Sequence, residues 1–110
     1  MGAILTLAER KAAAVERKRA ALEALRPALA DYARAHGGRF LLFGSAARGT
    51  LRRDSDIDIL TDFPDQETAA AWNFAERACW DRGLSPDVMA KSWCNDEFLE
   101  HIEPDIEVIA

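Results

Sequence analysis

Residues 39–43 form a five-residue run between two glycine-containing segments, Gly37-Gly38 and Gly44-Ser45. A short, largely apolar run bounded by glycines predicts a buried β-strand. Glycine adopts the left-handed helix-ending conformation at little cost, so Gly37-Gly38 predicts the end of a preceding helix. Residues 44–49 then predict a short helix directly after the strand. A strand placed this closely between two helices indicates a sheet with helices packed on it.

A long helix is expected before this strand. Thr6 to Glu9 has the form of a capping box, in which a Thr side chain binds the first amides. Apolar residues then recur at near-helical spacing up to Ala33. Pro27 interrupts the pattern and predicts either a kink or a new helix start, because its ring removes one hydrogen bond.

A second strand is expected over residues 56–60, where apolar and acidic residues alternate with period two. The remaining expected elements are a polar loop over 50–55, a helix over 66–82, a strand over 87–90, a helix from Asn95 or Asp96 to Glu103, and an edge strand over 106–109. This order predicts the α+β class, a small mixed β-sheet with helices packed on it.

The length of 110 residues predicts one domain over 1–110. Within it, 1–36 is the N-terminal helical segment and 39–110 the sheet-containing catalytic core. No apolar run approaches the ~18 residues of a membrane span, and the start lacks the layout of a signal peptide. Cys79 and Cys94 form no CxxC motif, so neither a disulfide framework nor a zinc site is indicated. A cytoplasmic location is therefore expected.

Charge divides the chain into two halves. Residues 1–53 carry 11 Lys or Arg against 4 Asp or Glu, whereas 54–110 carry 3 against 15. A sequence pI near 5.0 argues against nucleic-acid binding as the main purpose. The basic segment 1–20 is interpreted as either a solvated extension or an arm that binds a partner.

Gly44 and Ser45 lie at the predicted junction of strand and helix. The first amides of a helix have no internal partner and favour an anion such as phosphate. The Ser45 hydroxyl adds a donor, and Arg48 can bind phosphate oxygens with its guanidinium fork. An ordinary turn capped by Ser is the alternative. Thr50 stands where a Walker A loop needs lysine, so that phosphate-binding motif is excluded.

Asp56 and Asp58 share one face of the second predicted strand, with Cα atoms about 7 Å apart. Neighbouring carboxylates repel one another unless a cation neutralises them, and Mg²⁺ suits such a pair beside substrate phosphates. A calcium loop is excluded because Ile59 replaces the required glycine and Asp65 the terminal Glu. Acidic residues on a solvated edge strand are the alternative.

A phosphate-binding turn beside two metal-binding carboxylates serves phosphoryl or nucleotidyl transfer. The stretch Phe43 to Gly49, followed by Asp54-Ser55-Asp56-Ile57-Asp58, resembles the Gly-Ser, ten residues, Asp-x-Asp signature of polymerase-β-like nucleotidyltransferases. The short chain is most similar to the minimal nucleotidyltransferases of that superfamily. These are often paired with all-helical HEPN proteins as toxin–antitoxin modules.

The resemblance implies a role for each matching residue. Gly44 and Ser45 would hold a nucleoside triphosphate, and Asp56 and Asp58 would bind Mg²⁺. Asp87 best matches the third carboxylate of the family, which would share the metal and accept the proton of an attacking hydroxyl. An Asp that merely ends the turn after Ser85-Pro86 is the alternative there. Arg48 and Arg53 are candidate phosphate partners, although a surface arginine is the more common outcome at position 53.

The resemblance further implies an ATP-using, Mg²⁺-dependent protein adenylyltransferase that modifies a hydroxyl of a HEPN toxin and acts as its antitoxin. One alternative is a non-catalytic subunit that neutralises its partner by occlusion. Another is a nucleotidyltransferase for a small molecule such as an antibiotic. Whether the protein forms a homo-oligomer is left open.

Three tryptophans, Trp72, Trp80 and Trp93, are expected mainly to pack in the core, with a partner-binding or base-stacking surface as the alternative. Cys79 on the same predicted helix as Trp72 is expected to be a small buried apolar residue. His36 and His101 are expected in capping or surface roles.

Overall fold

The computed structural model describes residue 4 and residues 6–110. Its helices and strands follow one another in this order: α1 Leu7–His36, β1 Arg39–Phe43, α2 Gly44–Arg48, β2 Ile57–Asp62, α3 Asp65–Trp80, β3 Pro86–Ala90, the 3₁₀ helix η1 Lys91–Trp93, α4 Asp96–Ile102, the 3₁₀ helix η2 Glu103–Asp105, and β4 Glu107–Ile109. The expected elements are all present, with bounds that differ by one or two residues at their ends.

The four strands form one mixed sheet in the order β3-β2-β1-β4. The central strand β1 is antiparallel to both β2 and β4, whereas β2 and β3 are parallel. A parallel pair needs a crossover, and α3 provides it. The predicted α+β class with a small mixed sheet is therefore confirmed.

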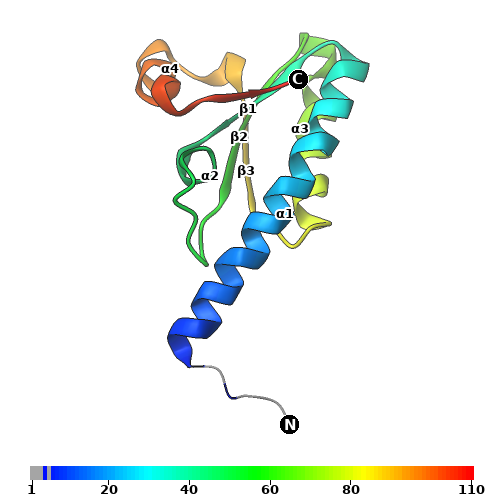
Figure 1. Ribbon diagram of the computed structural model, residues 1–110. Helices are drawn as coiled ribbons and strands as arrows, with labels where there is room; N and C mark the ends of the chain where they lie inside the picture. The colour runs from blue at the N-terminus through cyan, green and yellow to red at the C-terminus, as the bar shows by residue number, and fades with distance from the viewer. Residues whose placement is uncertain (1–3, 5) are drawn as a thin grey trace.

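Helices α1 and α3 cover one face of the sheet, and α4 covers the other (Figure 1). Alternation along β2 divides its side chains between these two cores. Ile57 and Ile59 are buried beneath α1 and α3, whereas Leu60 packs with Ile102 of α4. Asp58 therefore lies on the α4 side, as the period-two pattern predicts.

Helix α1 begins where the capping box predicts, with Thr6 Oγ1 accepting a hydrogen bond from the Glu9 amide. It ends at Gly37, which has a φ of 72°. The helix continues through Pro27 as a single element, so no second helix begins there. Its buried residues lie in the C-terminal half, and the N-terminal half extends beyond the sheet (Figure 1).

The second strand starts later than expected. Asp56 lies just before β2, which begins at Ile57 and continues to Asp62. The Ile57 amide donates to the Ser85 carbonyl, so pairing with the chain ahead of β3 starts only at this residue. No helix in the described part of the chain is both long enough and apolar enough to cross a membrane.

Candidate active site

The end of β1 and the starts of β2 and β3 meet at one end of the sheet. Phe43, the last residue of β1, is paired with Asp58, and Asp58 lies beside Asp87 on β3. Gly44 follows Phe43 directly. The sheet register therefore brings the predicted phosphate-binding turn next to two of the predicted metal-binding carboxylates.

Gly44 is required at this junction for two reasons. Its φ of 69° lies in the left-handed region that side chains rarely adopt. A Cβ at this position would also lie less than 3.0 Å from Asp58 Oδ2 and 3.2 Å from Asp58 Cγ. The backbone of the turn can therefore approach the carboxylate only because the residue is glycine.

Ser45 lies in the first turn of α2 and is half-buried. No side chain of the described residues caps this turn. The first amides of a helix have no partner within the helix itself. The turn thus offers backbone donors, next to the Ser45 hydroxyl, at the position where the sequence predicts phosphate.

Asp58 is costly to ionise in this environment. Its pKa is raised from 3.8 to about 6, first by partial burial and then by the charge of the neighbouring Asp87 and a hydrogen bond with it. Asp56 contributes to the same increase of the pKa, whereas Arg48 lowers it. The three carboxyl groups predicted to bind metal therefore lie near enough to interact electrostatically.

These carboxyl groups have the oxygen ligands that Mg²⁺ prefers. Asp58 is half-buried, whereas Asp56 and Asp87 are exposed at the mouth of the site. Among the residues that the structure describes, no three acidic, His or Cys side chains converge tightly enough to enclose an ion. The residue types and the mutual repulsion fit a divalent cation, with the remaining ligands to come from phosphate or water.

The loop that carries Asp56 is held in place by a residue far away in the sequence. Lys18 of α1 donates from Nζ to the carbonyl oxygens of Arg53 and Ser55, at 2.8 and 2.6 Å. The Ser55 hydroxyl also accepts from the Arg52 amide at 2.8 Å. Lys18 was not singled out from the sequence, because no local pattern connects it with a loop 35 residues further on.

The Arg48 side chain is held by an ion pair outside the candidate site. Its Nη1 donates to Asp105 Oδ2 of η2 at 3.0 Å. The side chain still lies near enough to Asp58 to lower the pKa of that carboxyl. Asp105 is a residue that sequence reasoning missed, because 57 positions separate it from Arg48. Arg53 is exposed and lines a hollow beside α1.

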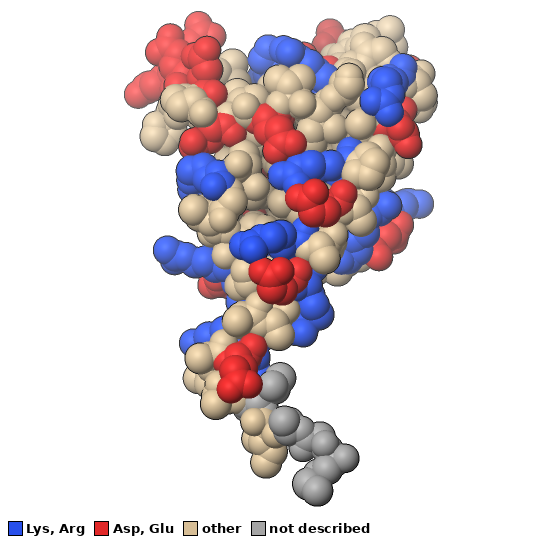
Figure 2. All heavy atoms as spheres, viewed as in Figure 1, with Lys and Arg blue, Asp and Glu red and all other residues tan. Residues whose placement is uncertain are grey.

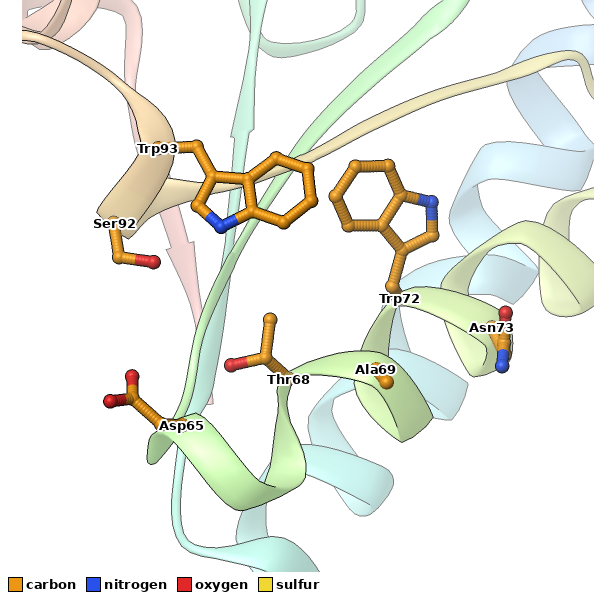
Figure 3. A pocket seen from close by; sticks show the side chains of 7 residues that line it. All are labelled: Asp65, Thr68, Ala69, Trp72, Asn73, Ser92 and Trp93. Carbon is orange, nitrogen blue, oxygen red and sulfur yellow. The ribbon is translucent and has the colours of Figure 1, made fainter.

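A separate hollow of about 590 Å³ lies at the other end of β3, between α3 and η1 (Figure 3). The rings of Trp72 and Trp93, which both line it, lie beside each other with centroids 5.2 Å apart. Asp65 stands at its rim. None of the predicted site residues lines this hollow.

The expectation that the tryptophans pack in the core is wrong for two of them. Trp93 is 71% exposed and Trp80 is 61% exposed. The core side of α3 is instead filled by small residues, which allow the helix to pack closely on the sheet. These are Ala71, Ala75, Ala78 and Cys79. The prediction for Cys79 is confirmed, since it is fully buried and burial raises the pKa of its thiol to about 11.

We expect Gly44→Ala and Gly49→Ala to differ sharply in stability. Both glycines have a positive φ, but a Cβ at Gly49 would meet nothing within 4 Å. Gly49→Ala should therefore cost about 1 kcal/mol of backbone strain, and Gly44→Ala several times as much. Urea unfolding measures both values. Equal losses would show that Gly44 does not press on Asp58, whereas Asp58→Ala should recover part of the loss in the double variant.

We expect Asp58→Asn to stabilise the protein at alkaline pH. Because the pKa of Asp58 is raised from 3.8 to about 6 on folding, the stabilisation from this group is full below 3.8 and is lost as pH rises through about 6. At about pH 8 the variant should be more stable by on the order of 1 kcal/mol, after allowance for partial exposure. The two stabilities should converge towards pH 4. Urea unfolding across this range is the measurement, with the exposed Asp54→Asn as matched control, and a pH-independent difference would contradict the expectation.

Comparison with known proteins identifies the family. No curated protein matches the chain significantly. A solved structure assigned as a minimal nucleotidyltransferase is similar, with a TM-score of 0.62 and 26% identity, over 81% of this chain and 93% of that one. The family described as nucleotidyltransferase domain matches residues 22–109. The chain therefore belongs to the nucleotidyltransferase domain family, and its predicted kinship with the minimal nucleotidyltransferases of the polymerase-β-like superfamily is confirmed.

Proposed function

We propose that this nucleotidyltransferase moves AMP from ATP to a hydroxyl group of a protein partner, with Mg²⁺, and that it serves as the antitoxin of a HEPN toxin. The observation that carries the transfer chemistry is the contact between the Gly44 turn and Asp58, with Asp87 beside it. This contact supports a triphosphate site and a cation site that share one edge. Nucleotidyltransferase domains generally use a divalent metal.

Each group has a role in the proposed reaction. The Gly44 and Ser45 donors would hold the triphosphate, and Arg48 would exchange Asp105 for a phosphate oxygen. Asp56, Asp58 and Asp87 would hold Mg²⁺, which when bound would neutralise charge on the phosphate oxygens.

The exposed position of Asp87 suits it to meet the acceptor. The acceptor oxygen forms a bond to the α-phosphorus while the bond from that phosphorus to the bridging oxygen of pyrophosphate breaks. The proton of the hydroxyl passes to the Asp87 carboxylate, which acts as general base, and pyrophosphate leaves.

The surface at the Trp72–Trp93 hollow supports a protein as the partner. Exposed tryptophans are frequent anchors of protein interfaces. Asp65 lies at the rim, and no Lys or Arg side chain of the described residues lines the hollow. A basic segment with an apolar anchor therefore fits best, because a cation can contact both the tryptophan rings and the carboxylate.

The transfer proposal is tested by capturing the partner from the native host, adding ATP and Mg²⁺, and measuring intact masses. The partner should gain one or more adenylyl units. Asp58→Asn should slow this transfer at least about 100-fold, whereas Asp54→Asn, in the preceding loop, should not. A partner that binds without gaining mass, and is still neutralised in cells by Asp58→Asn, would establish occlusion instead.

The docking surface is tested with Trp93→Ser, using Trp80→Ser as the matched control. Both side chains are exposed, but Trp80 does not line the hollow. Loss of an aromatic anchor commonly weakens an interface about tenfold or more, so Trp93→Ser should raise the Kd for the purified partner by that factor and Trp80→Ser should not. Equal Kd values for both variants would place the partner elsewhere.

A further inference from the structure

A second hollow, of about 330 Å³, is lined by four cationic side chains. Arg17 and Lys18 come from α1, Arg53 from the loop before β2, and Arg82 from the turn after α3. No acidic side chain of the described residues lines it. In Figure 2 basic and acidic side chains alternate along α1, while acidic side chains are concentrated at the α4 end.

Two of the cations in this hollow lack the carboxylate partners that several other arginines have. Arg26, Arg39 and Arg48 each bind a carboxylate of the acidic half. Neither Arg17 nor Arg53 pairs with a carboxylate within the described ranges, 4 and 6–110. The exposed guanidinium groups of Arg17 and Arg53 therefore share the hollow with two further cations.

The other two cations are fixed by backbone contacts that leave their charge in place. Lys18 donates to two loop carbonyls, and Arg82 Nη1 donates to the Ala78 carbonyl at 3.0 Å. Like charges held together repel one another unless an anion joins them. Phosphate oxygens suit arginine best, because the guanidinium fork matches them with two parallel hydrogen bonds.

The hollow lies near the loop that carries Asp56. Arg53 is three residues before Asp56, so the two Cα atoms lie within about 10 Å of each other by chain reach alone. The hollow also depends on a part of the chain that the family match leaves out, because Arg17 and Lys18 precede residue 22. Two of its four cations, Arg53 and Arg82, therefore lie in the matched domain, and the other two come from the part of α1 before it.

We propose that this hollow binds closely spaced phosphate groups, either along the backbone of single-stranded RNA or in a free oligophosphate. The net charge of −5 disfavours binding to the rest of the surface. Binding should therefore depend on this one cluster. Association should weaken with salt, because each phosphate contact releases counterions.

The test is binding, not transfer, so its result is independent of the proposed reaction. A fluorescent ten-nucleotide single-stranded RNA is titrated with the full chain, and binding is measured by fluorescence anisotropy. All proteins carry Asp58→Asn, and Mg²⁺ is left out. Inorganic tripolyphosphate is then added as competitor. The variants are Arg17→Glu and Arg53→Glu. Arg34→Glu is the control, because it changes the same charge on the same helix about 25 Å further along α1.

Arg17→Glu and Arg53→Glu should each weaken RNA binding at least about fivefold and reduce the salt slope by about 0.7, whereas Arg34→Glu should change neither. Tripolyphosphate that competes would identify a site for any oligophosphate; RNA binding without competition would identify a site for the nucleic-acid backbone. If RNA does not bind but calorimetry shows tripolyphosphate binding that Arg17→Glu weakens, the ligand is the free oligophosphate. No binding of either probe, or equal loss with Arg34→Glu, would overturn the proposal.

Discussion

The approach of the Gly44 backbone to the Asp58 carboxylate is the contact on which the rest of the site depends. It exists because β1 and β2 are antiparallel and in a register that pairs Phe43 with Asp58. The parallel pairing of β2 and β3 then adds Asp87 on the same face. A shift of one residue in either register would turn a carboxylate to the opposite face and separate the turn from it.

The site is therefore assembled at the expense of stability. A half-buried carboxyl beside a second one is unfavourable, as the raised pKa of Asp58 shows. The two core clusters on either side of the sheet hold the strands so firmly that this repulsion is tolerated. Strain and unfavourable charge of this kind are common where a protein binds a cation or an anionic substrate.

Charge has a different role in the fold from the one its distribution along the chain indicates. A basic half followed by an acidic half is compatible with a basic surface, or simply with one basic helix and one acidic half. In the structure several basic residues of the first half instead bind carboxylates of the second. Arg26 holds Glu107 of β4 through two of its nitrogens, at 2.9 and 3.1 Å, and Arg48 holds Asp105. These pairs neutralise one another, whereas Arg17 and Arg53 have no carboxylate partner among the described residues.

Local patterns of the sequence determined the elements and the identity of the carboxylates in question. The signals are local: glycines, the capping box and the period-two alternation over 56–60 each extend over only a few residues. The sequence alone therefore predicts the helices and strands that they mark. Only the tertiary structure decided the strand order and the exposure of Trp80 and Trp93. It also decided the pairing of Asp105 with Arg48 and the hydrogen bonds from Lys18 to the loop at 53–55. Each of these depends on which distant segments pack together, and small side chains on α3, not the large tryptophans, proved to fill the core side of that helix. The sequence thus specified which residues form the candidate site, and long-range packing decided which groups hold them in place.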